Sequence, residues 1–218
     1  MNKHVVMNKK IILYLRTDLS NHQLTAGGSV ARTLGVIGGF NQLGYQVICA
    51  SSCMQSVLEK QHLEMLISLK NPQILSFLRW KINCFLSSFF FCVPILFKLK
   101  NRSVLFIYQR YSLLNITGLL IAWWYKKKLI LEYNGSEVWI ATHWVQKKRC
   151  MKLTWLMEKV ETWNLHYADL VVVVSEALKS ELLQKGVSPS KILVNPNGVD
   201  PEQYNPDGKK VENENTRF

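Results

Sequence analysis

The chain has 218 residues, of which 48% are hydrophobic and 11% aromatic, enough for a sizeable core in one large domain or two small ones. This composition excludes disorder over most of the length. The net charge of +12 indicates contact with phosphate groups, nucleic acid or an anionic membrane surface.

The N-terminal residues, MNKHVVMNKKIILYLR, lack the apolar stretch and the cleavage site of a secretory signal peptide. The five cysteines form no Cys-x-x-Cys pair, so neither a zinc site nor a disulfide framework is predicted. Both features fit a reducing compartment, and we expect a cytoplasmic protein.

Short apolar runs predict six β-strands along the chain. They are nearly continuous in apolar residues rather than alternating, which is typical of strands buried on both faces. Helical patterns separate them, so we expect an α/β fold with a Rossmann-like, doubly wound parallel sheet. The predicted strands are 11–15, 45–50, 104–108, 129–133, 170–174 and 191–195.

One predicted helix begins near Ser29. Three further helices are predicted at 113–125, 151–167 and 176–185. Ser175 can cap the last of these, and Gly186 supplies its left-handed stop. Helical spacing places six residues of the 151–167 segment on one apolar face. These residues are Leu153, Leu156, Met157, Val160, Trp163 and Tyr167.

Residues 74–102, ILSFLRWKINCFLSSFFFCVPILFKLKNR, carry no charge between Lys81 and Lys98. That span is shorter than the ~20 residues of a membrane-crossing helix, and it includes Pro94. We favour a helix buried against the sheet. A spanning helix is one alternative, and an amphipathic helix in the membrane surface, with flanking basic side chains on lipid phosphates, is another. Those side chains are Arg79, Lys81, Lys98 and Lys100.

The segment TAGGSVARTLG, residues 25–35, follows the first strand and opens a helix. Gly27 and Gly28 allow a sharp bend and a close approach of a ligand to the backbone. The amides of Gly28, Ser29 and Val30 would then lie at a helix N-terminus, where a phosphate is favoured. The alternative is a plain strand-to-helix turn. The segment fits neither the dinucleotide fingerprint nor the P-loop.

The segment LEYNGSEVWI, residues 131–140, presents polar groups directly after a predicted strand. Asn134 and Glu137, around Gly135, could bind sugar hydroxyls or orient an attacking oxygen; the alternative is an Asn-Gly turn with a capping serine. Arg110 ends another strand and could hold an anion, or lie on the surface without a ligand. His22 and His143 are isolated and no Asp-x-Asp pair occurs, so no metal site is predicted.

The last third of the chain, ADLVVVVSEALKSELLQKGVSPSKILVNPNGVDPEQYNPD at 168–207, closely resembles the end of the N-terminal domain of glycosyltransferase family 4 enzymes of the GT-B fold. The resemblance covers about residues 9–207. It implies an N-terminal, acceptor-side domain at 9–195, and a linker with the start of a second, donor domain at 196–218. That second domain, with the acidic motif of the family, is expected after residue 207, so we expect a fragment or a split enzyme.

The resemblance implies a retaining transferase that moves a sugar from a nucleotide-sugar to a lipid-linked or polysaccharide acceptor in cell-surface glycan synthesis. It implies no bound cofactor or catalytic metal. Gly27, Gly28 and Ser29 would contact the diphosphate side, and Asn134, Gly135, Glu137 and Arg110 the acceptor side; no nucleophile is assigned. The alternative is a non-catalytic half that docks an acceptor, a partner subunit or the inner membrane face. No recognised nucleic-acid-binding motif is present, and we expect no nucleic acid partner.

Overall fold

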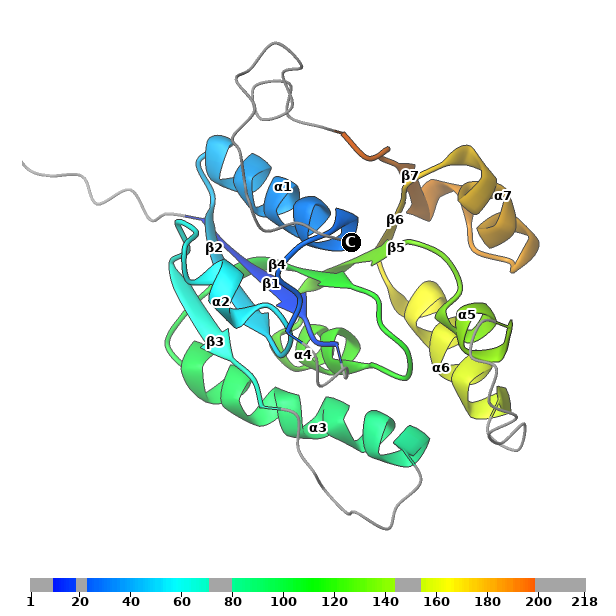
Figure 1. Ribbon diagram of the computed structural model, residues 1–218, viewed down its shortest axis with the longest axis horizontal. Coiled ribbons are helices and arrows are strands. Elements are labelled where there is room, and N and C mark those ends of the chain that lie inside the picture. Colours follow the sequence, from blue (N-terminus) through cyan, green and yellow to red (C-terminus); the bar gives the residue numbers. More distant parts are fainter. Residues whose placement is uncertain (1–9, 19–22, 71–79, 144–153, 199–218) are drawn as a thin grey trace, which may run out of the picture.

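The computed structural model describes residues 10–18, 23–70, 80–143 and 154–198, which form a seven-stranded sheet between helices (Figure 1). All strand pairs are parallel, in the order β3-β2-β1-β4-β5-β6-β7, which confirms the predicted α/β, Rossmann-like class. The strands are β1 (Ile11–Arg16), β2 (Gln46–Ser51), β3 (Met65–Ser68), β4 (Val104–Arg110), β5 (Lys128–Tyr133), β6 (Leu170–Val173) and β7 (Ile192–Val194).

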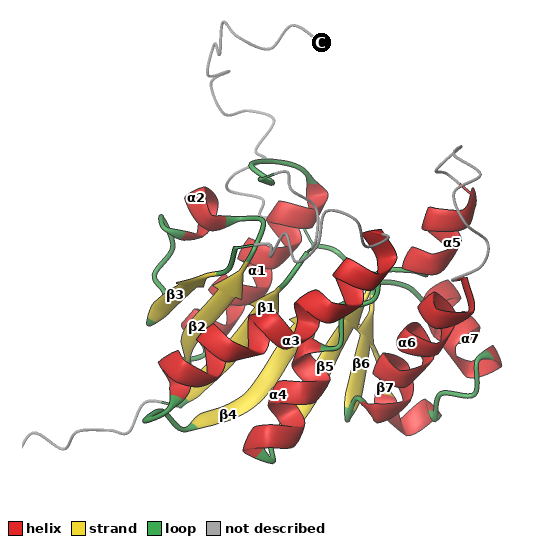
Figure 2. Ribbon diagram, turned by 90° about the horizontal axis from the view of Figure 1, so that it is seen from below, coloured by secondary structure: helices red, strands yellow, loops and turns green. Residues whose placement is uncertain are grey.

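Helices cover both faces of the sheet (Figure 2). One face carries α1 (Gly28–Gln42) and the short α2 (Gln55–Leu58). The other carries α3 (Trp80–Leu99), α4 (Thr117–Tyr125), α6 (Thr154–Tyr167) and α7 (Glu176–Gln184). The remaining helices are α5 (Glu137–His143) and the 3-10 turn η2 (Pro189–Lys191).

Alternate strand residues supply two hydrophobic cores. Leu13 and Leu15 of β1 face the core that includes residues of α3, α4 and α6, whereas Ile12 and Tyr14 face the core beneath α1 and α2. A strand with an apolar layer on each side must be apolar at every position. This explains the nearly continuous apolar runs in the sequence.

The six predicted strands are confirmed with small shifts at their ends, but β3 was missed. Its four residues, MLIS, lie at the edge of the sheet, and a run this short gives little periodicity. The helix predicted at 176–185 is confirmed together with its ends. Leu178 N donates to Ser175 Oγ at 3.3 Å, and Gly186 has a φ of +81°.

The apolar face predicted for the 151–167 segment is only partly correct; residues 151–153 lie outside the described part of the chain. Met157 and Val160 are buried, but Trp163 and Tyr167 are largely exposed. Instead, α6 buries three other residues, Glu161, Asn164 and Leu165. The two polar residues lie inside because they have partners, as described below, and hydrophobic periodicity does not register such partners.

Residues 80–99 of the unusually apolar stretch form α3, while residues 74–79 lie outside the described part. Four of its side chains are buried against the sheet, as the favoured prediction required: Phe91, Cys92, Ile95 and Leu99. By length and composition, Ile82–Leu99 is the one described helix that could cross a membrane, with 39% of that window buried inside the protein. The opposite face of α3 is exposed.

A buried asparagine joins the segments beneath the carboxyl ends of the strands. Asn115 Nδ2 donates to the Thr17 carbonyl oxygen at 2.6 Å and to Thr17 Oγ1 at 2.7 Å, while Asn115 Oδ1 accepts from Thr117 N at 2.8 Å. Asn164 Nδ2 of α6 donates to the Asn115 carbonyl oxygen at 2.9 Å. Asn115 therefore connects the loop after β1 with α4 and α6.

We predict that Asn115→Ala lowers the free energy of unfolding by about 2–4 kcal/mol, because it leaves several buried donors and acceptors without partners. Urea denaturation followed by circular dichroism measures the change. Asn41→Ala is the control, because the bond from Asn41 Nδ2 to the His62 carbonyl oxygen is exposed, and it should cost less than about 1 kcal/mol. Equal losses in the two variants would contradict this role for Asn115.

Candidate functional site

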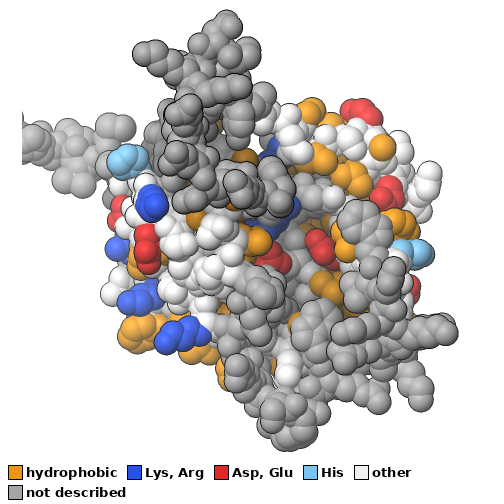
Figure 3. All heavy atoms as spheres, viewed as in Figure 1, with side chains coloured by type: hydrophobic (Ala, Val, Ile, Leu, Met, Phe, Trp, Pro, Cys, Tyr) orange, Lys and Arg blue, Asp and Glu red, His pale blue; other side chains and the backbone are white. Residues whose placement is uncertain are grey.

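The two segments singled out in the sequence lie at the same edge of the sheet. Residues 25–29 follow β1 and residues 134–137 follow β5, and parallel strands place their carboxyl ends at one edge. This edge is where α/β sheets bind ligands, at the point where the strand order reverses. Acidic and basic side chains gather there in a hollow between α1 and α5 (Figure 3).

The glycine-rich segment forms an open helix N-terminus. Gly27 is the N-cap of α1 with a φ of +103°, which strongly favours glycine, and no side chain of the described residues caps the helix. The first amides of a helix have no intrahelical acceptor, and this applies to Gly28 and Ser29. Val30 N also lies in the first turn, as predicted, but it donates to the Gly27 carbonyl oxygen at 3.0 Å. Both glycines are exposed, with open space at each Cβ position.

Arg16, the last residue of β1, connects the two segments. Its Nη2 donates to Ser29 Oγ at 2.7 Å and pairs with Asp18 Oδ2 at 2.9 Å. Its charge also acts on Glu137 at the start of α5. Arg16 is almost fully buried, and its Nε has no hydrogen-bond acceptor in the part of the chain that the structure describes. A fixed positive charge therefore lies beside the N-terminus of α1.

Glu132 of β5 is fully buried and organises the other half of the site. Its Oε1 pairs with Arg110 Nη1 at 2.9 Å and accepts from Asn134 Nδ2 at 2.9 Å. Its Oε2 accepts from the Tyr108 hydroxyl at 2.8 Å and lies 3.6 Å from Arg32 Nε. This single carboxylate thus joins β4, β5 and α1. Burial and the Glu132 charge raise the pKa of Tyr108 well above its ordinary value, so the phenol stays protonated.

Arg32 extends this network to the segment after β7. Its Nη1 donates to the Pro196 carbonyl oxygen at 3.0 Å and to Asn197 Oδ1 at 3.3 Å. These two residues belong to the NPNG sequence on which the family resemblance depends. Arg32 Nη2 is buried and has no partner among the described residues. Arg32 and Arg110 thus share the Glu132 carboxylate, and Arg16 ends the neighbouring strand β1 at the same edge of the sheet.

The corner after β5 is held by glycine and serine. Gly135 has a φ of +124°, where side chains are strained. Ser136 Oγ accepts from Trp139 N at 3.1 Å, capping α5, and donates to Glu161 Oε1 at 3.0 Å. Ser136 is therefore the predicted capping serine, and it orients the start of α5. The predicted polar corner is present as well.

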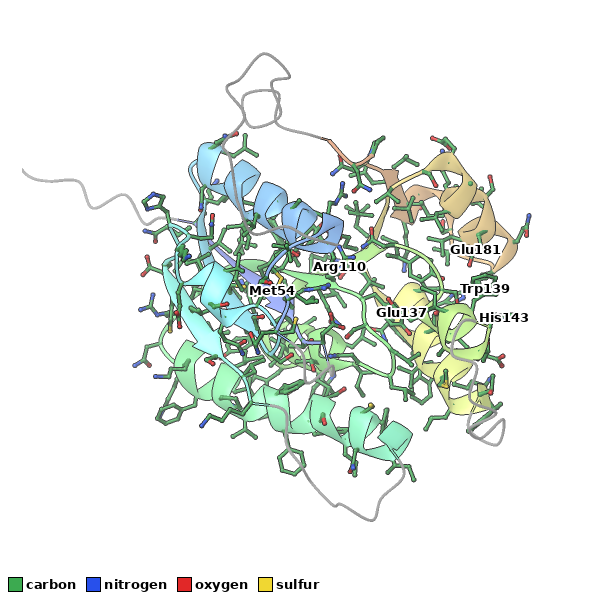
Figure 4. All side chains as sticks on the ribbon, in the orientation of Figure 1. Met54, Arg110, Glu137, Trp139, His143 and Glu181 are labelled. Carbon is green, nitrogen blue, oxygen red and sulfur yellow. The ribbon has the colours of Figure 1, made fainter. Side chains whose placement is uncertain are left out.

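Glu137 is half-buried at this corner, and it lies near the middle of the view together with Arg110 (Figure 4). Burial raises the pKa of its carboxyl above the ordinary value, and the Asp18 charge adds to that rise, while Arg110 and Arg16 lower it. Perturbed carboxyls among opposing charges are typical of functional sites.

The structure thus brings together all seven predicted site residues, while their ligand contacts stay a prediction. Sequence reasoning missed Arg16, Arg32, Asp18 and Glu132. One signal was visible, because Glu132 is a charge within the otherwise apolar strand LILEY, and a buried charge requires partners.

Among the described histidines, only His143 was considered in the sequence as a site residue. His143 ends α5, and its ring stacks on Trp139 with 4.8 Å between centroids, while His22 lies outside the described residues. Within the described ranges, no three side chains of His, Cys, Asp or Glu gather in a way that could hold a metal ion.

The sequence profile of Glycosyltransferase Family 4 matches residues 26–203, most of the chain and both segments of the site. The chain belongs to glycosyltransferase family 4. No curated protein sequence matches it significantly.

Several solved structures share this fold. Sucrose-phosphate synthase from Thermosynechococcus elongatus superposes with a TM-score of 0.62 at 17% identity, over 89% of this chain and 49% of that one. A glycosyltransferase from Rickettsia africae gives 0.57 at 20% identity, over 94% and 47%. The Anabaena protein HepE, solved with UDP-glucose, gives 0.56 at 15%, over 89% and 45%.

The chain spans about half the length of these structures. At such identities the likeness establishes the fold, and it agrees with the N-terminal half of the GT-B fold. The predicted boundary between 9–195 and 196–218 stays a prediction, because the described residues of this family 4 chain end at 198.

We predict that Glu132→Gln lowers the free energy of unfolding by about 3 kcal/mol or more, because it leaves two arginines without their buried counter-charge. Chemical denaturation at neutral pH measures the loss. Glu176→Gln is the matched control, since Glu176 pairs with Lys179 on an exposed helix surface, and it should cost less than about 1 kcal/mol. A Glu132 variant as stable as the control would contradict the structural role of the carboxylate.

We predict that Glu137→Gln, in contrast to Glu132→Gln, raises the free energy of unfolding at pH 7. The raised pKa in the folded state means that folding disfavours the ionised carboxyl, so the neutral variant should be more stable than the parent at pH 7. The difference should vanish as the pH falls below the pKa of the unfolded state, where both states hold the proton. Thermal unfolding across this pH range tests the prediction, and a variant less stable at pH 7 would contradict it.

Proposed function

We propose that this chain is the N-terminal part of a retaining glycosyltransferase, which transfers a sugar from a nucleotide-sugar to a lipid-linked or polysaccharide acceptor. The observation that carries the proposal is the open N-terminus of α1, with the amides of Gly28 and Ser29 beside Arg16. Amides at a helix N-terminus together with a fixed cation favour a diphosphate. UDP-glucose and UDP are bound in solved structures with the same fold, HepE and MnaA from S. aureus.

The residues suggest a division of the site into two sides. On the α1 side, the exposed glycines let a diphosphate approach the backbone, and Arg16 neutralises charge that builds up as the nucleotide leaves. On the β5 side, Glu132 fixes the amide nitrogen of Asn134, which leaves the amide carbonyl to accept from a sugar hydroxyl. Glu137 adds a half-buried carboxyl that can orient an acceptor hydroxyl.

Arg110 is held by Glu132 between these two sides. Its Nη1 is engaged with the carboxylate, so its charge is fixed in place before any ligand arrives. A preorganised cation costs little reorganisation when a charged ligand binds. We therefore assign Arg110 to the positioning of an acceptor or donor oxygen, and we assign no nucleophile. The donor is a substrate, and the mechanism proposed here uses no resident metal or cofactor.

We infer the cellular location of the enzyme from the chemistry of its proposed substrates. Nucleotide-sugars are charged and do not cross a bilayer unaided, because an unpaired ion is costly in hydrocarbon. A transferase with a lipid-linked acceptor would therefore act in the cytoplasm, at the inner face of the cell membrane.

Gly28→Asp tests the diphosphate site without weakening the helix. A carboxylate at a helix N-terminus stabilises the helix but repels a diphosphate, and the space at Gly28 accommodates the side chain. We predict that Gly28→Asp in the full-length protein lowers the affinity for UDP and other nucleoside diphosphates by roughly tenfold or more. Thermal stability should be unchanged or higher. Calorimetric titration measures the affinity.

Gly35→Asp is the matched control, because Gly35 is exposed in the same helix with open space at its Cβ position, two turns away. Its affinity should stay near that of the parent. Nucleotide binding that is insensitive to Gly28→Asp would contradict the site. Turnover with a panel of nucleotide-sugars, with the anomeric configuration of the product read by NMR, tests the retaining reaction. Binding of an acceptor without turnover of any donor would favour the non-catalytic alternative.

A further inference from the structure

The outer surface of α3 and α4 is apolar and exposed. Six large side chains on it face solvent, and the most exposed are Trp123 at 77% and Phe97 at 75%. We call this set the aromatic face. Its members are Phe89, Phe90, Val93 and Phe97 of α3, with Trp123 and Trp124 of α4.

The two helices present this face together. They contact each other along the same side of the sheet, where both lie in front of the strands (Figure 2). The Tyr125 hydroxyl donates to the Leu96 carbonyl oxygen at 3.4 Å, so their last turns lie side by side. Contiguous exposed apolar surface of this kind marks a site of interaction with another molecule or a membrane.

An apolar groove of about 440 Å³ continues the aromatic face toward α6. Trp123 lies on one side of it, and Trp163 and Tyr167 lie on the other. These are the two α6 residues that helical spacing assigned to the same apolar face as Met157 and Val160, and that the structure leaves exposed. Lys127 and Asp169 are the charged residues of its lining, and the rest of the lining is mainly aliphatic.

The two helices that carry the aromatic face together contain basic residues and no acidic residue. Residues 65–131 contain no Asp or Glu, and this range includes all of α3 and α4. Four lysines near the C-terminal ends of these helices make no ion pair with any described residue: Lys98, Lys100, Lys126 and Lys127. Favourable helix-dipole contacts account for a lysine in a last turn, but not for the absence of every acid.

We propose that the aromatic face docks on an anionic lipid bilayer, with Trp123 and Trp124 in the interfacial region and the lysines on lipid headgroups. Tryptophan is enriched at membrane interfaces, and juxtaposed lysines add attraction to anionic lipids. A second copy of this chain does not fit the same face, because two surfaces rich in lysine and free of acid repel each other.

The fold requires that α3 lie on the bilayer rather than cross it. Phe91, Cys92, Ile95 and Leu99 are buried in the main core between α3 and the sheet. A helix that crossed the membrane would leave that core and expose the strands beneath it. Burial of only the outer face keeps the core intact, as in helices that lie in the plane of the interface.

Sedimentation with vesicles tests the proposal, using phosphatidylcholine alone and phosphatidylcholine with phosphatidylglycerol as the anionic lipid. We predict that the protein sediments with the anionic vesicles and far less with the neutral ones. Trp123→Gln with Trp124→Gln should weaken binding to anionic vesicles by roughly tenfold or more. Lys100→Gln with Lys127→Gln should weaken it comparably, and salt should reduce the binding of the parent.

The controls replace comparably exposed residues on the other face of the sheet, next to α1 and α2. Leu43→Gln replaces an equally exposed apolar residue, 74% exposed, at the end of α1, and Lys60→Gln removes an exposed lysine just after α2. Each control should bind within about twofold of the parent, since it leaves the aromatic face and its lysines unchanged. Thermal unfolding of every variant separates a loss of binding from a loss of fold.

Two results would overturn the proposal. One is a parent protein that stays in the supernatant with anionic vesicles, or that binds as well after the Trp123 and Trp124 changes. The other is a lipid-free dimer, detected by light scattering, that the same tryptophan changes dissociate, since this would assign the face to a protein contact. The assay contains no sugar donor, so its outcome is independent of the proposed transferase activity.

Discussion

The carboxylate of Glu132 is the constraint on which the arrangement of the site depends. It is fully buried and it contacts Arg110 and Tyr108 of β4, Arg32 of α1 and Asn134 of the loop after β5. A buried charge is costly unless partners surround it, so the segments that supply those partners must come together when the chain folds. The fold gains a fixed geometry from this requirement. Because the charged groups lose their hydration on burial, Glu132 and its arginine partners add little net stability. They do fix the positions of β4, β5 and α1 relative to one another.

This constraint also explains why the two segments of the candidate site are held as one unit. Arg32 joins Glu132 to α1 and to the Pro196 segment, and Arg16 joins β1 to Ser29. The glycine bend and the Asn-Gly corner are therefore positioned by interactions beneath them, which leaves Gly27 and Gly28 themselves open to solvent. A ligand would meet backbone amides and cations already in place, which is the condition for effective electrostatic stabilisation.

The aromatic face lies on the outside of helices whose inner sides form the main core. Its lysines lie near the ends of α3 and α4 that lead into β4 and β5, whereas the candidate site lies at the opposite ends of these strands. A protein docked through this face would keep the candidate site, at the other end of the sheet, open to the solvent. The two features thus occupy separate parts of the molecule and impose no conflicting demand on the same residues.

The sequence by itself determined the class of fold, six of the seven strands, the ends of α7 and the edge at which the site lies, because strand burial, helix capping and parallel topology leave local patterns. It gave no position for β3, whose four residues carry little periodicity. Only the tertiary structure decided that Glu161 and Asn164 are buried while Trp163 and Tyr167 are exposed, and that Arg32 and Arg110 share the carboxylate of Glu132. The reason is that the free energy of burying a polar group depends on partners that lie far away in the sequence. A local sequence pattern does not identify those partners.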